Sequence, residues 1–487
     1  MRLSKSRYTA GLQCHRQLWW RVHEPDAPEL VPNASQQAIF DQGHRVGAEA
    51  RERVPGGVLI DLPHDAIAER IETTRKALAE GAPVIYEASF MADDTFAAVD
   101  ILERSEDDWR LVEVKSSTKV KPEHIPDVAV QLHVLRRSGL AVGRAEVMHL
   151  NRACIHPDLD DLFARPDVTA EAEQLLPGTP AEIGRQLAML GKPIPEVPIG
   201  RHCDTPHECP FKGRCFPKRP EHHISKLYYI GARSWDLEAE GVTTIDELPA
   251  GFRLQPPAER QRRAVATGKT IVEPGLAAAL AELQAPIAIL DFETVAPAIP
   301  VWNGCRPYDP VPVQFSCHVQ DGRGGWTHHE WLAEGPADPR PEMVRRLTSA
   351  CQGAGTILAY YSNFEDRTLR LVAEALPEIA KPVQNVLVRL ADARPIVRDH
   401  VYHLDFGGSF SLKAVLPALV PELSYEGMEI AGGMAASYQL ERLLLRGETV
   451  PAPERERLRE ALRRYCELDT WGVVRMLERL GELAEAR

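Results

Sequence analysis

The chain has 487 residues, of which 44% are hydrophobic and 26% are charged, and its formal net charge is −13. This length predicts two or three domains of ordinary globular composition. No run approaches the roughly 20 apolar residues of a membrane helix, and the basic N-terminus lacks the apolar core of a secretory signal. These features exclude a membrane protein and predict a cytoplasmic one. The acidic balance does not exclude nucleic-acid binding, because nucleases use carboxylates for metal ions.

The predicted elements divide the chain into three parts. Residues 1–220 form an α/β unit with early helices, strands near 96–102 and 110–116, and a helix over about 125–138. Residues 221–284 are rich in Gly and Pro and predict a connector, with a possible helical hairpin over 234–248. Residues 285–487 form a second α/β unit, from a strand at 287–290 to a long helix over about 454–485.

Two carboxylates and a lysine are predicted to meet on the first hairpin. A polar turn over 105–108 joins its strands and, if centred between residues 106 and 107, places Asp100 opposite Glu113. Glu113 and Lys115 then share one face of the strand. The carboxylates repel each other unless a divalent cation binds between them. The alternative is a solvated hairpin face with one ion pair.

Asp100 followed by Glu113-Val-Lys115 resembles the core of PD-(D/E)xK nucleases. His44, in Gly43-His44 on an upstream helix, resembles the additional metal ligand of RecB-like members of that family. Gln131 resembles their downstream glutamine motif, although Leu135 stands where an aromatic residue is usual. The resemblance implies that Mg²⁺ or Mn²⁺ binds to His44, Asp100 and Glu113, and that Lys115 and Gln131 are catalytic.

Three cysteines lie close together at equal spacing, and a fourth lies near the N-terminus. Cys203, Cys209 and Cys215 stand in a segment stiffened by prolines, and Cys14 is the candidate fourth ligand of a metal or cluster. The set resembles that of iron–sulfur RecB-like nucleases, including AddB-type helicase-nucleases and CRISPR-associated exonucleases. The resemblance implies a 4Fe–4S cluster that closes a loop of nearly two hundred residues.

Two alternatives for these cysteines stay open. The gap of five residues between Cys203 and Cys209, where two are common, leaves the cluster type open. Structural zinc is a rival, because His202 and His207 offer further ligands. The thiols could also be unliganded.

A second set of carboxylates is predicted in the C-terminal half. The apolar strand beginning at residue 287 ends in Asp291-Phe-Glu293, whose two acids share one face. Asp469 lies within the apolar stripe of the last helix, with Tyr465 one turn before it. A carboxylate in such a stripe is costly unless it is paired or bound to metal. The alternative is a structural ion pair with a basic residue.

These pieces resemble the three motifs of DEDDy 3′–5′ exonucleases. Asp291 and Glu293 match the first motif, and Tyr465-Cys-Glu-Leu-Asp469 matches the third. The middle motif normally has Asp after Phe, whereas this chain has Glu365, so Glu365 is the expected third acid. The alternatives are Asp366 and, more weakly, Asp392.

The DEDDy resemblance implies an RNase H-like (DnaQ-like) fold with two Mg²⁺ or Mn²⁺ ions held by Asp291, Glu293, Glu365 and Asp469. Tyr465 would orient the attacking water. The segment from Gly407 to Leu416 contains Lys413 and is expected to approach the nucleic-acid backbone.

The whole chain resembles a bacterial family that joins an iron–sulfur RecB-like nuclease to a DEDDy-type exonuclease domain. The implied fold is α/β throughout, with a restriction-endonuclease-like first domain and an RNase H-like second domain. The implied function is a metal-dependent nuclease with two centres, acting on DNA more readily than RNA, in repair, defence or mobile-element processing. The alternatives are a ribonuclease and a nucleic-acid-binding adaptor with one degenerate centre.

Overall fold

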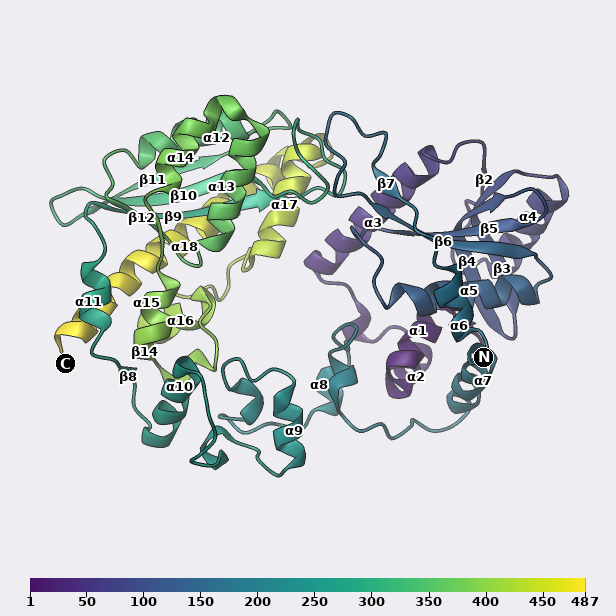
Figure 1. Ribbon diagram of the computed structural model, residues 1–487, viewed down its shortest axis with the longest axis horizontal. Helices are drawn as coiled ribbons and strands as arrows, with labels where there is room; N and C mark the ends of the chain where they lie inside the picture. Colours follow the sequence, from purple (N-terminus) through teal and green to yellow (C-terminus); the bar gives the residue numbers. More distant parts are fainter. Residues whose placement is uncertain (487) are drawn as a thin grey trace. The chain divides into compact units, whose positions relative to one another are not determined.

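The computed structural model describes residues 1–486, and both of its compact units are α/β (Figure 1). Unit 1 comprises Met1–Pro217 together with Ala298–Pro300, and unit 2 comprises Lys218–Pro297 and the chain from Val301 onward. By its contacts the expected connector is therefore part of unit 2. Over the described residues, no helix combines the length and the apolar character that a membrane crossing requires.

Unit 1 is built on a seven-stranded mixed sheet with the strand order β2-β3-β4-β5-β6-β7, and β1 pairs with β4. The central hairpin of β4 and β5 is antiparallel, and β5 and β6 are parallel. The predicted strands near 96–102 and 110–116 are confirmed. The strands are β1 (Leu3–Ser4), β2 (Val58–Leu59), β3 (Val84–Ala92), β4 (Thr95–Arg104), β5 (Trp109–Lys115), β6 (Val142–Leu150) and β7 (Phe163–Ala164).

Helices cover both faces of this sheet. On one face α5, with α4 and α6, buries the larger core, and on the other α3 packs its C-terminal turn against Ile101 and Val112. The predicted helix near 125–138 is confirmed as α5. The helices are α1 (Lys5–Gln13), α2 (His15–His23), α3 (Ala34–Glu52), α4 (Ile67–Ala79), α5 (His124–Arg137), α6 (Thr169–Leu175), α7 (Thr179–Leu190) and α8 (Lys212–Cys215).

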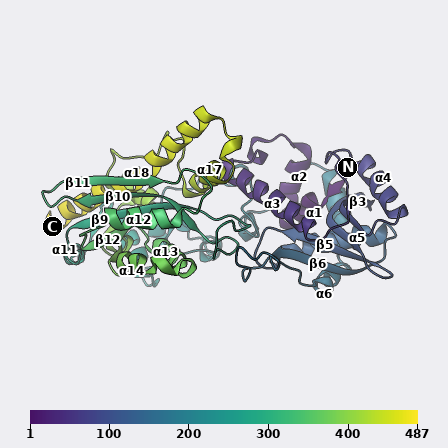
Figure 2. The same cartoon turned by 90° about the horizontal axis from the view of Figure 1, so that it is seen from above.

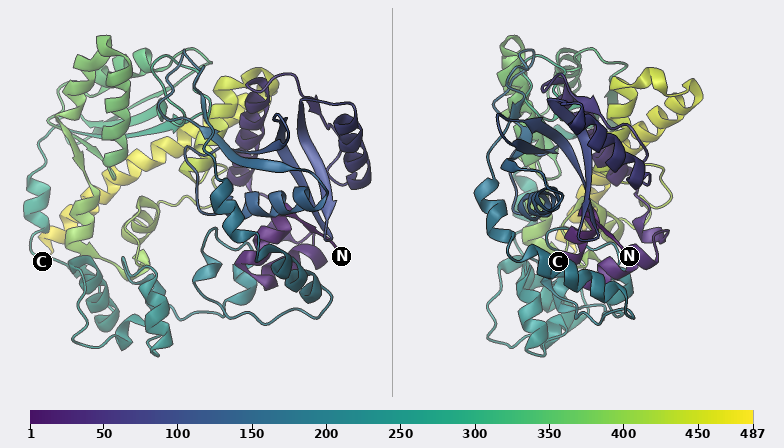
Figure 3. Two further views of the ribbon diagram at one scale, coloured as in Figure 1. Left: turned by 45° about the vertical axis from the view of Figure 1, so that its right-hand side comes forward. Right: turned by 90° about the vertical axis from the view of Figure 1, so that its right-hand side faces the viewer.

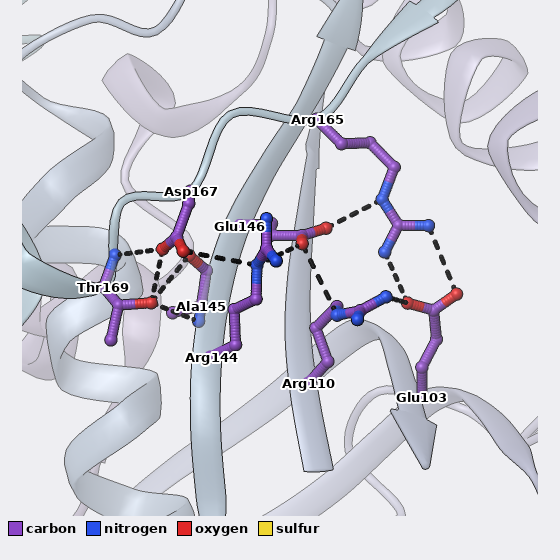
Figure 4. A network of polar contacts seen from close by, with 8 residues as sticks. All are labelled: Glu103, Arg110, Arg144, Ala145, Glu146, Arg165, Asp167 and Thr169. Atoms are coloured by element: carbon purple, nitrogen blue, oxygen red, sulfur yellow. Dashed lines mark hydrogen bonds and ion pairs between the residues drawn. The ribbon is translucent and has the colours of Figure 1, made fainter. Parts of the chain in front are cut away.

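A charged network fastens the segment after β7 to the sheet (Figure 4). Glu146 is only 3% exposed, and its two oxygens lie 2.7 Å from Nε of Arg144 and 2.8 Å from Nε of Arg165. Arg165 and Arg110 also pair with Glu103. A carboxylate buried to this degree needs such partners, so this network is structural.

The first part of unit 2 consists of short elements. The expected helical hairpin over 234–248 is a single short helix followed by a 3-10 turn, because a left-handed glycine, Gly241, ends the helix early. The elements are η3 (Ile224–Lys226), α9 (Arg233–Ala239), η4 (Ile245–Glu247), α10 (Pro256–Thr267), β8 (Ile271–Val272) and α11 (Leu276–Ala281). β8 pairs with β14 (Val401–Tyr402) in a two-stranded sheet.

The main sheet of unit 2 has five strands in the order β11-β10-β9-β12-β13. β9 is antiparallel to β10 and parallel to β12, so the sheet is mixed. The predicted strand at 287–290 is confirmed and extends to Val295. The strands are β9 (Ile287–Val295), β10 (Val311–Gln320), β11 (Trp326–Leu332), β12 (Thr356–Ala359) and β13 (Leu390–Asp392).

The helices of unit 2 lie on both faces of this sheet, as Figure 2 shows from above. α12 (Arg340–Ala350), α13 (Asn363–Ala375) and α14 (Ala380–Leu387) pack against Leu290 and Phe292 of β9. α15 (Arg394–His400), α16 (Leu412–Leu419), α17 (Gly433–Leu445) and α18 (Ala452–Glu485) enclose the other core. Figure 3 (left) follows the long, yellow α18 across the sheet, where it contacts β9 and β10.

Candidate metal centres

Three carboxylates of unit 2 converge between β9 and α18. Alternate residues of β9 face opposite cores, so Asp291 and Glu293 face α18 while Phe292 packs on the far side. The apolar stripe predicted for the last helix is confirmed as buried, and it carries Asp469 to the same place. One carboxylate oxygen from each acid lies within 4.8 Å of the other two. We call Asp291, Glu293 and Asp469, together with the nearby Glu365, the acid centre.

The acid centre is electrostatically unfavourable without a cation. Burial raises the pKa of Glu293 to about 8 and that of Asp469 to about 6, and Asp469 further raises the pKa of Glu293. Burial and then Asp469 raise the pKa of Asp291 well above its usual value. Hard divalent cations prefer carboxylate oxygens and remove this repulsion, so the oxygen-only donor set fits Mg²⁺ or Mn²⁺.

Two tyrosines and a lysine border the acid centre. The Tyr425 hydroxyl donates a hydrogen bond to Oδ1 of Asp469, and a Tyr465 hydrogen bond likewise favours the charged form of that carboxylate. The ammonium of Lys413 lies 5.2 Å from the Tyr465 ring centre and lowers the pKa values of Glu293 and Asp469. Tyr425 carries no motif, so sequence reasoning did not find it.

The structure distinguishes the three candidates for the middle acid. Glu365 is 4% exposed, burial raises its pKa to about 7, and its Oε2 is a buried atom without a hydrogen-bond partner. Asp366 faces outward, 2.7 Å from Nε of Arg370. Asp392 accepts hydrogen bonds from the backbone N–H groups of Tyr361 and Arg394. Only Glu365 therefore leaves a buried carboxylate oxygen free to meet an ion.

A matched pair of substitutions tests this distinction. Glu365→Gln is expected to weaken Mn²⁺ binding and lower any Mn²⁺-dependent cleavage at least tenfold, because it removes a charged ligand at constant shape. Asp366→Asn, next to it on α13, is expected to change both less than about twofold, because the exposed pair with Arg370 is worth little. Calorimetric Mn²⁺ titration and cleavage rates measure the effects. The reverse ranking would assign the acid to Asp366.

In unit 1 the carboxylates form a row across three strands. The observed pairs Ile101–Val112 and Leu102–Leu111 have the predicted register. Continued by one residue along each strand, this register places Asp100 opposite Glu113. On the other side, Asp100 stands opposite Glu87 of β3, between the pairs Tyr86–Ile101 and Ala88–Val99. Glu87 has a φ of 58°, an outlier for a residue with a side chain. No sequence motif marked Glu87.

Neighbouring cations offset more of the negative charge of this row than of the negative charge of the acid centre. Lys5 and Lys115 each place Nζ 2.7 Å from Oε1 of Glu113, which is 2% exposed, and Lys115 also donates to Asp127. Gln131 donates to the other Glu113 oxygen at 2.8 Å. Burial would raise the pKa of Glu113, but Lys115 and Lys5 outweigh it and lower that pKa. Burial and then Glu113 raise the pKa of Asp100 to about 7.

His44, the expected third metal ligand, lies exposed on α3, which packs against β5. Within residues 1–486, two groups of three His, Cys, Asp or Glu side chains have ligand atoms within 4.8 Å of one another, and neither includes His44. Its role as a ligand stays a prediction. Sequence reasoning missed Lys5 and Asp127, which lie 108 and 14 residues from Glu113 in the chain.

Lys115→Ala is expected to abolish cleavage by a unit 1 centre and also to cost about 2 kcal/mol of stability, because it breaks a largely buried ion pair that Lys5 partly replaces. The structure thus adds a stability role to a side chain for which the resemblance implies only a catalytic one. The measurements are a thermal melt and cleavage in an Asp469→Asn background. Lys119→Ala, an exposed lysine nearby, is the control. Unchanged cleavage would remove Lys115 from the mechanism.

The four predicted cysteines of unit 1 line one pocket, with Trp20 and His202 beside them. Gln13 joins their two segments by donating hydrogen bonds of 2.7 Å to the carbonyls of His202 and His207. Burial, and then charge on the other three cysteines, raises the pKa of Cys209 to about 11. Cys14, which is distant in the chain, therefore lies near Cys203, Cys209 and Cys215 in space, as the resemblance led us to expect.

The cysteine sulfurs are not arranged around a single ion. Within residues 1–486, no three of them lie within 4.8 Å of one another. A tetrahedral zinc with bonds of about 2.3 Å requires sulfurs roughly 3.8 Å apart. All nine cysteines are free thiols. Four thiolates can hold either zinc or a 4Fe–4S cluster, so the donor set does not distinguish the two groups, and the 4Fe–4S assignment stays a proposal.

A second group in unit 2 has metal-ligand chemistry but an unsuitable geometry. His318, His328 and Glu467 have ligand atoms within 4.8 Å of one another. The two imidazole rings, however, are stacked 4.4 Å apart at 17°. Nearly parallel rings direct their in-plane lone pairs side by side and not to one point. Hydrogen bonds of 2.9 Å between His318 and Thr470 and between His328 and Ser316 make the group a polar network.

The comparisons with known proteins identify one region of the chain. A family model described as "Domain of unknown function (DUF2779)" matches residues 288–411. This stretch contains Asp291, Glu293 and Glu365 but ends before Asp469, and it includes none of the candidate residues of unit 1. No curated protein matches the chain. The description of the family states no activity, so the function must be argued from the residues.

Proposed function

We propose that this protein is a metal-dependent nuclease and that its acid centre hydrolyses phosphodiester bonds at the end of a nucleic-acid strand. The observation that carries the proposal is the convergence of three largely buried carboxylates within 4.8 Å in the acid centre. Among residues 1–486, Lys413 is the cation that lowers the pKa values of both Glu293 and Asp469. Repulsion between these carboxylates does not stabilise the fold, whereas a metal site requires carboxylates that are clustered in this way.

Asp291, Glu293, Glu365 and Asp469 would hold the ions. Mg²⁺ or Mn²⁺, when bound, would stabilise the charge on the attacking and leaving oxygens of the phosphodiester. The unpartnered Oε2 of Glu365 supports this assignment, because a buried carboxylate oxygen without a partner costs free energy in the absence of a ligand.

The other residues would position water and substrate. The Tyr465 hydroxyl lies beside Asp469 and would orient the attacking water. Tyr425 holds Asp469 through its own hydrogen bond, so it is a positioning residue. Lys413 bears a positive charge at the edge of the site, where it would attract the phosphate.

We also propose a second nuclease centre in unit 1, with Asp100 and Glu113 as ligands and Lys115 and Gln131 acting at the phosphate. This centre is the weaker candidate. Counting the named side chains, Lys5, Lys115 and Arg70 face four carboxylates, Glu87, Asp100, Glu113 and Asp127. This group therefore has one more negative charge than positive charges. The four carboxylates of the acid centre, counted with Lys413, have three more. A binding role for unit 1 with a silent centre is therefore the second candidate function.

Cys14, Cys203, Cys209 and Cys215 would hold a 4Fe–4S cluster, which would tie the ends of unit 1 together. DNA is the proposed substrate in preference to RNA, within repair, defence or mobile-element processing. The cytoplasm is the proposed location, since all nine cysteines are free thiols, as a reducing compartment favours.

The test is digestion of DNA and RNA, single- and double-stranded, labelled at the 5′ or the 3′ end. We expect metal-dependent, stepwise release of nucleotides from one end with Mg²⁺ or Mn²⁺, and none with EDTA. Binding without cleavage under any of these metals would favour the adaptor. Cleavage confined to RNA would assign a ribonuclease.

A further inference from the structure

A cavity of about 730 Å³ lies in unit 2 directly beside the acid centre. Asp291, Asp469 and Tyr465 form one of its walls. Its volume lies within the about 300–1,000 Å³ of ligand pockets, which is enough for more than one nucleotide. The rest of its lining includes aromatic and basic side chains from segments outside the acid centre.

Two tyrosines lining this cavity are unusually exposed. Tyr229 is 81% exposed and Tyr361 is 49% exposed. Both have left-handed backbones, with φ of 60° and 72°. This conformation costs about 1–3 kcal/mol for a bulky residue and persists only where the surroundings impose it. Tyr229 recovers little of that cost by burial and Tyr361 only part of it, so core packing does not explain why both rings are held in this conformation.

Neighbouring residues hold both tyrosines in place. The backbone N–H of Tyr361 donates to Oδ1 of Asp392 at 2.8 Å, which gives that carboxylate a role other than metal binding. Next to Tyr229, the backbone N–H of Tyr228 donates to Oε1 of Gln261 at 2.8 Å. The rings of Tyr228 and Tyr229 meet edge to face, with their centres 4.6 Å apart. The rings are thus presented on a firmly held backbone.

Two basic side chains line the cavity, and one of them contacts an exposed ring. The guanidinium of Arg394 stacks over Tyr361, 4.7 Å from its ring centre, and Nη2 of Arg394 lies 3.5 Å from the Tyr228 hydroxyl. Lys413 also lines the cavity. Exposed aromatic faces interleaved with cations are the arrangement that binds unpaired nucleic acid, in which bases stack and phosphates meet cations.

We propose that this cavity binds the unpaired terminal nucleotides of a strand, with bases stacked on Tyr229 and Tyr361 and phosphates near Arg394 and Lys413. The inference rests on the proposed function, because the acid centre would act on the strand held here. It gives the segment before β9 a direct role in substrate binding, since Tyr229 precedes the residues matched by the family model. A duplex end would first have to open.

The test is binding of a fluorescein-labelled single-stranded dT8 oligonucleotide, measured by anisotropy in the Asp469→Asn background so that any acid-centre cleavage is suppressed. Tyr229→Ala and Tyr361→Ala are each expected to weaken binding at least about fivefold, the loss of one base–aromatic stack. Tyr229→Phe and Tyr361→Phe keep the ring and are expected to bind within about twofold. Val388→Ala removes an exposed apolar side chain outside the cavity and is expected to leave binding unchanged.

A second measurement follows a new fluorescence signal and does not depend on a loss of binding. Tyr229→Trp is expected to retain binding, and its added fluorescence is expected to fall when dT8 stacks on the indole. Equal affinities for the Ala and Phe variants, or no change in the Trp signal, would overturn the proposal. If the Ala variants lose binding while the wild-type chain cleaves no nucleic acid, the strand-binding inference stands and the proposed hydrolysis fails.

Discussion

Asp469→Asn is expected to lower the rate of the proposed Mn²⁺-dependent exonuclease reaction at least about a hundredfold, as removal of a catalytic electrostatic group does. It is also expected to raise stability in metal-free buffer. The substitution keeps the shape and the acceptor for Tyr425 but removes one of several charges that repel each other. The rate is measured in an Asp100→Asn background, which silences the unit 1 centre.

The gain in stability should depend on pH. Burial raises the pKa of Asp469 in the folded protein to about 6, above its usual 3.8. Between these values the Asp469 carboxyl holds a proton in the folded protein but releases it in the unfolded chain. The free energy of unfolding of the wild type therefore falls relative to the Asn variant from about pH 4 to pH 6. The stability advantage of Asn is therefore expected to be absent below about pH 4 and to grow as Asp469 titrates near pH 6. It is expected to grow further up to about pH 8, because loss of the Asp469 charge also lowers the raised pKa of Glu293. Thermal melts in EDTA across this range measure it.

Two controls accompany this prediction. Glu467→Gln removes an exposed carboxylate on the same helix and is expected to leave the rate and the Mn²⁺-induced stabilisation nearly unchanged. Tyr465→Phe is expected to lower the rate less than Asp469→Asn, with little effect on metal affinity, because the phenol is proposed to orient water. Equal stabilisation of wild type and Asp469→Asn by Mn²⁺, with cleavage retained, would make Asp469 a structural partner of Tyr425.

Cys209→Ser is expected to remove the iron of the proposed cluster from anaerobically purified protein and to lower the melting temperature of unit 1 by at least about 5 °C. Site-binding energy is folding energy when the ligands join distant segments, and a few kcal/mol shifts a domain of this size by that much. Cys209 lies against Trp20 and Phe211 in a small core, so some loss of packing is included.

Iron, sulfide and zinc analysis with calorimetry measures the outcome. Cys154→Ser replaces another buried thiol of unit 1, whose neighbour is the Asp158 carbonyl at 3.4 Å, and is expected to keep the iron. Iron and sulfide in roughly equal amounts in the wild type would support the cluster. Stoichiometric zinc without iron, or identical metal content in wild type and Cys209→Ser, would contradict it.

Local patterns determined a large part of the fold. The turn after β4 and the alternation of the strands predicted the hairpin register, because side chains two residues apart share a face. The spacing of apolar residues in α18 predicted which face is buried and that Asp469 lies on it. The same reasoning set Asp291 and Glu293 on one face of β9, opposite to Phe292. Each of these inferences concerns residues related by a helical or strand repeat.

Tertiary structure alone decided which distant groups meet. Lys5 reaches Glu113 from α1, 108 residues earlier in the chain, and Tyr425 reaches Asp469 from a loop without a motif. The residues expected to form a connector belong to unit 2, because β8 pairs with β14 and the guanidinium of Arg260 donates to the carbonyl of Arg398. Periodicity reports neighbours along one element, whereas these contacts depend on how elements pack. The sequence therefore predicted the carboxylates, and the packing of helices and loops decided which cations, hydroxyls and aromatic rings surround them.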